Sequence, residues 1–199
     1  MLNIIIIRKE NCIFAVLKNR NMLEKFDIEN AKAAMLYILS KLGKTDFIHL
    51  FKILYFAERK CLCRCGHLIV DDKYIAMRKG PVPSTIYDLF KNIRNGTKED
   101  NFFNKSFLIY ENHFVEAIES PDMDCLSVFD VECLDESIKE NKDLDSDTLS
   151  EKSHDYAWKN SDINEEIDII NIAKAEGASE EMIDYIKENI EISKILGCV

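Results

Sequence analysis

The sequence predicts a mainly α-helical protein with a small β element, an α+β fold built around one compact helical domain. Three observations predict it. Apolar residues recur at helical spacing over most of the chain after residue 26, and short apolar runs flank turn residues in two places. With 47% hydrophobic and 31% charged residues in a chain of 199, the composition is that of a globular protein and excludes wholesale disorder.

The first two helices are predicted together with their ends. Apolar residues recur at i, i+3, i+4, i+7, i+8 and i+11 from Ala31, with Asp27 as N-cap and Gly43 as the stop. Asp46 is placed to cap a second helix that ends at Gly66. The apolar face expected for this second helix consists of Phe47, Leu50, Phe51, Leu54 and Tyr55. The short connection between the two predicts a helical hairpin.

After the second helix, the pattern changes to that of a β-hairpin. Residues 67–70 and 74–77 are short apolar or aromatic runs that flank the polar residues 71–73, which is typical of two strands and a turn. This hairpin is expected to end at Gly80. Residues 81–83 should then be extended, because each proline disfavours helical geometry in the residue before it.

The rest of the chain is predicted as helix, a second strand pair, and helix again. Ser84 is placed to cap a helix that ends at Gly96. The sequence then predicts strands at 107–110 and 114–118, helices at about 130–141 and 146–158, and only helix beyond them. The last helix begins at Ser179, and its apolar stripe is Met182, Ile183, Ile186, Ile190 and Ile195. This stripe is expected to be buried on the same domain or on a partner.

The chain divides into three parts. Residues 1–25 form an N-terminal extension with short apolar runs at Ile4–Ile7 and Ile13–Leu17, and Met22 is an alternative start of translation. The main domain is expected over residues 26–160, and residues 161–199 form a C-terminal helical segment.

Charge and cysteine usage restrict the partners and the compartment. Residues 130–199 hold 20 acidic and 7 basic residues, so this third of the chain repels phosphate backbones and favours a basic protein partner. Seven cysteines, an odd number without regular spacing, predict a reducing cytoplasm rather than a disulfide framework. The apolar start breaks at Arg8, far short of the roughly 20 residues that span a membrane. No nucleic acid and no membrane partner is expected.

Four soft ligands lie close together in the sequence. Cys61, Cys63, Cys65 and His67 form the string C-x-C-x-C-x-H, the most conspicuous metal candidate in the chain. Its spacing argues against zinc, because paired cysteine ligands favour two to four intervening residues and no second pair completes a tetrahedron. The sequence therefore predicts no metal, with reduced cysteines packed as small apolar residues.

No catalytic motif stands out. Ser153, His154 and Asp155 have the residue types of a hydrolase triad, but neighbours in sequence cannot point at one another as a triad requires. His154 lies four residues before Trp158, so the two rings are expected to stack, as a structural pair or as the floor of a binding groove. Walker, dinucleotide-binding, zinc-protease and esterase motifs are missing, and no cofactor is predicted.

Three segments carry a resemblance in their order and spacing: KILYFAERK (Lys52–Lys60), GHLIVDDKYIAMRKGPVPSTIYDLFK (Gly66–Lys91) and LSEKSHDYAW (Leu149–Trp158). Together they resemble the SocA-like antitoxin family, also called the Panacea domain, and are similar to phage-associated GepA-like proteins. Glu58 stands where the family usually has Asp. The matching positions are Lys52, Tyr55, Ala57, Gly66, Tyr74, Ala76, Gly80, Pro81, Val82, Pro83, Ser84, Tyr87, His154 and Trp158.

The resemblance implies an antitoxin that neutralises a toxin encoded beside it by direct contact, without a catalytic step. The toxin-binding or motif residues that it implies are Tyr55, Tyr74, Gly80, Pro81, Pro83, Ser84, Tyr87, His154 and Trp158. For each of these, a purely structural role stands beside the contact role. The toxin is expected to be basic, which would complement the acidic C-terminal third.

Other functions stay open at this point. The protein is alternatively a proteolytic adaptor that delivers the toxin to a cytosolic protease, or a phage-associated accessory protein without a toxin. An enzyme built around Tyr55, Glu58 or His154 would need a polar pocket that joins these side chains. Isoleucine-rich helices also allow a homodimer.

Overall fold

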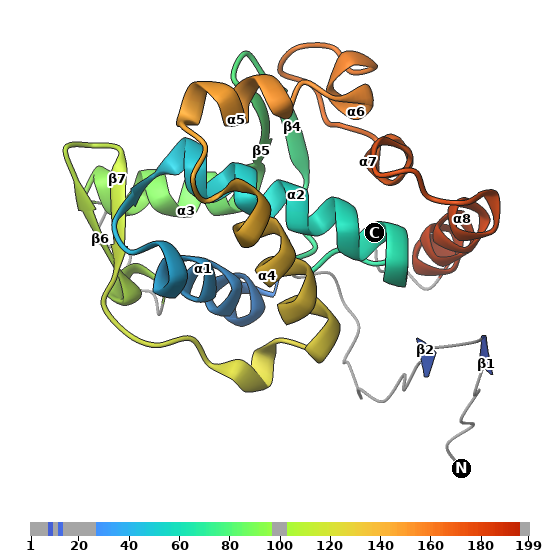
Figure 1. The fold of residues 1–199 in the computed structure, drawn as a ribbon, viewed down its shortest axis with the longest axis horizontal. Helices are drawn as coiled ribbons and strands as arrows, with labels where there is room; N and C mark the ends of the chain where they lie inside the picture. Colours follow the sequence, from blue (N-terminus) through green and yellow to red (C-terminus); the bar gives the residue numbers. More distant parts are fainter. Residues whose placement is uncertain (1–7, 10–11, 14–26, 97–102, 196–199) are drawn as a thin grey trace.

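The computed structural model describes residues 8–9, 12–13, 27–96 and 103–195, and it confirms a mainly α-helical fold with small antiparallel β elements (Figure 1). The predicted strand at Ile4–Ile7, most of the run Ile13–Leu17, and Met22 lie outside the described residues. The helices are α1 (Ile28–Leu42), α2 (Phe47–Cys65), α3 (Ser84–Arg94), α4 (Val128–Asn141), α5 (Ser146–Lys152), α6 (Tyr156–Lys159), α7 (Ile169–Ala175) and α8 (Glu180–Ile195). The strands are β1 (Arg8–Lys9), β2 (Cys12–Ile13), β3 (Thr45–Asp46), β4 (Tyr74–Met77), β5 (Gly80–Pro83), β6 (Phe107–Tyr110) and β7 (Phe114–Ala117).

Helix α2 runs through the middle of the molecule and is buried on two faces (Figure 1). One face packs against α1, α3, α4, β6 and β7, which form the first core. Tyr55, Phe56 and Leu62 face the second core, together with β4 and α5 to α8. Phe51 lies in the first core and Tyr55 in the second, so the expectation that they share one face of the helix is wrong. Apolar side chains on both faces are typical of a buried helix.

Both predicted ends of the first two helices are confirmed. The Asp27 carboxylate accepts a hydrogen bond from Asn30 N at 3.2 Å, and the Asp46 carboxylate accepts one from His49 N at 3.0 Å. Gly66 closes α2 in the left-handed region at φ 73°. The sequence did not predict that the connection between the helices forms β3, which pairs with β7 in a three-stranded sheet of order β3-β7-β6.

The first β-hairpin is displaced from its predicted place. Tyr74–Met77 is a strand, but it pairs with Gly80–Pro83 and not with residues 67–70, so Gly80 opens β5 instead of ending the hairpin. Residues 67–70 are irregular because the backbone N–H groups of Ile69 and Val70 donate to the buried Glu58 carboxylate. The Glu58 side chain therefore accepts the backbone N–H groups that a β ladder was expected to pair.

The start of α3 also differs from the expectation. Ser84 is the first helical residue and makes no capping bond. The Asp72 carboxylate caps the helix instead, because its two oxygens accept hydrogen bonds from Thr85 N at 3.0 Å and Ile86 N at 2.9 Å. The sequence predicted Ser84, next to the helix, as the capping residue. The observed cap, Asp72, lies instead in the loop before β4.

The helix predicted at 146–158 is broken in two. It ends at Lys152, and α6 starts after Asp155, whose Oδ1 accepts a hydrogen bond from Trp158 N at 3.1 Å. The other oxygen of Asp155 binds side chains of α2, which fixes the break. Residues 161–168 are not helical either, because they run beside β4, where Ile167 N donates to Tyr74 O at 2.7 Å.

The C-terminal isoleucine stripe is buried on the same chain. Ile183 and Ile186 lie in the second core, whereas Ile195 is 83% exposed. The Ser179 hydroxyl accepts a hydrogen bond from Met182 N at 3.3 Å, as the predicted N-terminus requires. Among the described helices, none combines the length and the apolar composition needed to cross a membrane.

Candidate functional site

A buried lysine joins α2 to the β4–β5 hairpin. Lys52 is 1% exposed, and its ammonium donates a hydrogen bond to Pro81 O at 2.7 Å. It forms no ion pair with any described carboxylate, and burial lowers the pKa of Lys52 to about 7. The lysine therefore binds the turn through a carbonyl group, which tolerates a neutral amine.

Only glycine fits at the first position of β5. Gly80 has φ 90°, and a Cβ atom there would lie 2.0 Å from Ser153 Oγ and 3.0 Å from Lys52 Cε. The Ser153 hydroxyl is held in place because it donates to Ser150 O at 2.7 Å. The start of the Gly80–Pro83 strand is thus pressed against α2 on one side and against the end of α5 on the other.

A second buried network ties α6 to α2. Asp155 Oδ2 accepts hydrogen bonds from the Tyr55 hydroxyl at 2.8 Å and from Arg59 at 2.9 Å. Arg59 also pairs with Glu176 at 2.6 Å, so one guanidinium links three segments. Burial, together with the Asp155 charge and hydrogen bond, raises the pKa of Tyr55 far above its ordinary value. This tyrosine is a hydrogen-bond donor at every physiological pH.

The predicted pair of aromatic rings is present. The rings of His154 and Trp158 stack with centroids 3.9 Å apart and planes at 23°. The indole Nε1 donates to Met77 O at 2.8 Å, which fastens α6 to the end of β4. Trp158 therefore links α6 to the β4–β5 hairpin through its indole hydrogen bond and stacks on His154.

The two remaining motif tyrosines have different environments. Tyr74 is fully buried beside Tyr55, with ring centroids 5.3 Å apart, and its hydroxyl has no hydrogen-bond partner among the described residues. Burial raises the pKa of Tyr74 well above its ordinary value. Tyr87 is half-buried in α3, packs edge-on against Phe51 at 6.1 Å, and presents the rest of its ring to an open groove.

This open groove has a volume of about 440 Å³ and lies where the N-terminal end of α2 meets the hairpin, α3 and the turn between β6 and β7. Apolar side chains from four elements form most of its surface. The residues that line it are Asp46, Phe47, Ile48, Phe51, Lys52, Met77, Lys79, Val82, Tyr87, Arg94, Asn112, His113, Phe114 and Ser146. Three matching positions of the resemblance, Lys52, Val82 and Tyr87, reach it.

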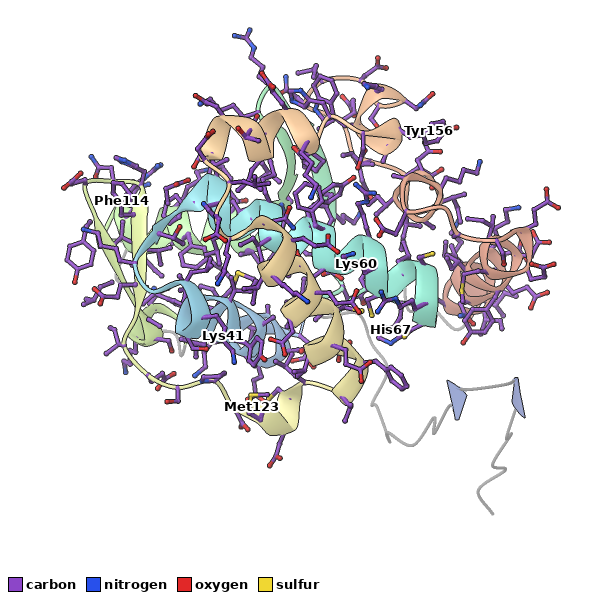
Figure 2. The ribbon with its side chains drawn as sticks, viewed as in Figure 1. Lys41, Lys60, His67, Phe114, Met123 and Tyr156 are labelled. Carbon is purple, nitrogen blue, oxygen red and sulfur yellow. The ribbon has the colours of Figure 1, made fainter. Side chains whose placement is uncertain are left out.

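The C-x-C-x-C-x-H string lies at the other end of α2, where Figure 2 shows His67 far from Phe114. The ligand atoms of Cys61, Cys65 and His67 all lie within 4.8 Å of one another. Cys63 points away and contacts Glu176 O at 3.9 Å. The string therefore separates into three grouped residues and one outlier.

The thiols of this group interact electrostatically. The neighbouring thiols of Cys133, on α4, and of Cys65 raise the pKa of Cys61. The Cys61 thiol in turn lowers the pKa of Cys65 to about 7, and His67 and Arg64 act in the same direction. The expectation of simple apolar packing omitted Cys133, which is 66 positions later than His67.

A family model described as antitoxin SocA-like, Panacea domain, matches residues 50–159. This match covers more than half of the chain. The chain belongs to the SocA-like antitoxin family. No curated protein sequence and no solved structure gives a significant match.

The Panacea domain places most of its motif side chains inside the fold. The Lys52 side chain contacts the turn at Gly80 and donates to Pro81 O. The Asp155 carboxylate accepts hydrogen bonds from the Tyr55 hydroxyl and from Trp158 N. Pro83 pairs with Tyr74 in the ladder between β4 and β5.

The enzyme hypothesis required Tyr55, Glu58 and His154 to share one polar pocket. In the Panacea domain, none of the three lines the groove. Glu58 binds backbone N–H groups, and Tyr55 binds Asp155. Burial raises the pKa of Glu58 to about 8, against the effect of the two N–H donors.

Sequence reasoning missed three residues of the motif region: Asp72, Arg59 and Asp155 in its bridging role. Asp72 and Arg59 lie inside the segments quoted for the resemblance, but each is the middle residue of three consecutive charged residues. Such a run is typical of a solvated surface, so the local sequence gives no signal that singles them out.

Proposed function

We propose that this protein is the antitoxin of a toxin–antitoxin pair, and that it neutralises a toxin encoded beside it by direct binding without a catalytic step. The observation that carries the proposal is the groove of about 440 Å³ beside the turn that the family motif builds. Its size is in the range of pockets that take a small ligand or a few side chains of a partner. The toxin inserts an apolar segment there.

The engagement of the motif side chains supports binding rather than catalysis. The Tyr55 hydroxyl already donates a hydrogen bond to Asp155, and the Glu58 side chain already accepts hydrogen bonds from two backbone N–H groups. A general acid or base must instead reach a substrate within hydrogen-bond distance. Apolar atoms form most of the surface of the groove, and apolar and aromatic side chains such as Ile48, Tyr87 and Phe114 are the types that anchor protein interfaces.

The C-terminal third of the chain, rather than the groove itself, supports a basic toxin. The groove is lined by Lys79 and Arg94, and Asp147, which follows Ser146, pairs with Lys79 at 3.5 Å. The C-terminal third holds 20 acidic and 7 basic residues. A cationic surface of the toxin would be attracted to this third, and the attraction would weaken as salt is added.

The test pairs two substitutions of the same kind. Ile48 lines the groove and Val128 is 73% exposed outside it, and both lie in the first turn of a helix, where an aspartate is favourable. Ile48→Asp and Val128→Asp are each co-expressed with the neighbouring reading frame, and growth and co-purification are scored. We expect Ile48→Asp to abolish both rescue and complex, and Val128→Asp to retain both.

Other outcomes separate the alternatives. Rescue that requires a cytosolic protease indicates a proteolytic adaptor, and a neighbour that is harmless to the host indicates an accessory protein without a toxin. Equal behaviour of the two variants contradicts the groove as the binding site. Light scattering on the protein alone tests the homodimer. The proposal places the pair in the cytoplasm, in keeping with the five described cysteines, which are all free thiols.

A further inference from the structure

Three ligand atoms meet where α2 ends and the chain reverses. Cys61 and Cys65 are four residues apart, so they lie on the same face of the helix. Gly66, in the left-handed region at φ 73°, then turns the chain so that His67 returns to that face. Cys61 Sγ lies 3.8 Å from His67 Nδ1, and the three ligand atoms are all within 4.8 Å of one another.

These separations are close to those of a metal tetrahedron. Zinc–sulfur bonds of 2.3 Å place two sulfur ligands about 3.8 Å apart, and a nitrogen ligand somewhat closer. For Cys61, Cys65 and His67 the observed spacing therefore needs a movement of about an ångström on metal binding, and His67 Nδ1 must also leave its contact with Leu68 O at 3.0 Å. Two of the three residues are on the same rigid helix, which limits the cost of bringing them together.

A fourth ligand comes from a distant part of the chain. Cys133 of α4 is 1% exposed, and its thiol lies near enough to that of Cys61 for the two groups to shift each other's pKa. Helix α4 packs along α2 in the first core, so this thiol is held against the cluster by the fold. The argument from sequence spacing against zinc depended on the lack of such a ligand, and α4 supplies it.

We propose that Cys61, Cys65, Cys133 and His67 bind one Zn²⁺ ion in a Cys₃His site. The three cysteines are almost completely buried and His67 is exposed, so the ion reaches the cluster from the side of the imidazole. Four protein ligands leave no open coordination position, so the site is structural. Bound zinc joins the C-terminal end of α2 to α4 and stabilises the folded state.

The environment of the cluster agrees with a bound cation. Three thiolates and Zn²⁺ leave one negative charge, and the guanidinium of Arg64 lies close enough to act on both Cys65 and Cys133. Arg64 is itself oriented by two hydrogen bonds to Glu136. The Asp130 carboxylate, 3.6 Å from Cys61 Sγ, is fixed by the Ser127 backbone N–H at 2.8 Å. The Arg64 contact is of the outer-shell kind that supports thiolate ligands, whereas the Asp130 carboxylate accepts the Cys61 thiol proton and opposes the thiolate form.

The experiment uses the full chain, purified under reducing conditions and loaded with Zn²⁺ or Co²⁺. Zinc per chain is measured by mass spectrometry, affinity by competition with a chromogenic chelator, and thiolate ligation from the charge-transfer and d–d bands of the Co²⁺ form. Cys133→Ser removes the ligand that only the structure identifies. His67→Ala removes an exposed ligand without disturbing the core. Cys63→Ser is the matched control, because it alters the same string at a thiol that faces Glu176.

We expect one tightly held Zn²⁺ per wild-type chain and a tetrahedral thiolate spectrum, both unchanged in Cys63→Ser. Cys133→Ser and His67→Ala should each lose affinity by about tenfold or more, since even the loss of an outer-shell partner reaches that scale. Far-UV circular dichroism of His67→Ala provides the check on folding. A wild-type chain without chelator-resistant zinc overturns the proposal, as does a Cys133→Ser or His67→Ala variant that binds zinc as tightly as Cys63→Ser does.

Discussion

Replacing Gly80 by alanine tests how the family's turn is held. The new Cβ atom would lie 2.0 Å from Ser153 Oγ and close to Lys52, both of which are buried. The positive φ of 90° costs about 1–3 kcal/mol for a residue with a side chain, and overpacking a filled site costs a further ~1–3 kcal/mol. We therefore expect Gly80→Ala to lower the free energy of unfolding by about 2–6 kcal/mol, a large part of the stability of a typical domain.

Two further variants separate strain from crowding. Gly43→Ala places a Cβ atom at a comparable φ of 70° with nothing within 4 Å, so it should cost only the backbone contribution, about 1–3 kcal/mol. Adding Ser153→Ala to Gly80→Ala removes the hydroxyl that the new atom meets, and it should recover part of the loss relative to Ser153→Ala alone. The coupling is obtained from a double-mutant cycle.

The assay is urea denaturation followed by tryptophan fluorescence. Trp158 is the single tryptophan of the chain, and its indole hydrogen-bonds to Met77 O in the same hairpin, so its emission reports directly on whether the hairpin is docked. If Gly80→Ala costs no more than Gly43→Ala, or if Ser153→Ala recovers nothing, then the close approach of Gly80 to α5 and α2 is not what demands glycine. The reasoning about the turn would then be refuted.

The same assay checks three further predictions. Burial lowers the pKa of Lys52 to about 7, so between about pH 7 and pH 10 the unfolded chain holds one more proton than the folded protein. The free energy of unfolding should therefore rise with pH over this range. Lys52→Met should lose this rise, and an equal slope in both proteins would contradict the prediction. Asp155→Ala should cost about 3 kcal/mol or more, because it leaves the buried Arg59 and Tyr55 donors without their acceptor, and Arg59→Met in the same background should restore part of that loss. Glu58→Gln should cost about 1–3 kcal/mol, since an amide accepts only one of the two backbone N–H bonds, and a neutral result would mean that the carboxylate does not shape residues 67–70.

The sequence predicted the elements whose signals are local. Both ends of α1 and α2 are marked by an aspartate and a glycine at the helix boundaries, and these short-range bonds do not depend on the rest of the fold. It failed where a distant side chain takes over a local role. Asp72 caps α3 in place of Ser84, and Glu58 replaces a strand partner for residues 67–70. Neither substitution is visible in a periodic pattern.

The candidate site was predictable to a similar extent. The stacking of His154 on Trp158 follows from a spacing of four residues, whereas the contact between Cys61 and Cys133 joins two helices that only the packing brings together. The groove is also a product of packing, since its walls come from α2, the hairpin, α3 and the turn before β7. No single segment of sequence carries a sign of it.

Helix α2 explains why a shared motif can serve different partners. Its interior side chains Lys52 and Tyr55 bind the hairpin turn and the segment around Asp155, so these motif positions fix the scaffold. The groove residues Ile48 and Phe114, by contrast, lie outside the matching positions of the motif and point into a space that the fold does not fill. Substitutions there change the surface offered to a partner without disturbing the contacts that hold the turn. For the antitoxin proposed above, specificity for a toxin would reside in such groove positions, outside the motif that identifies the family.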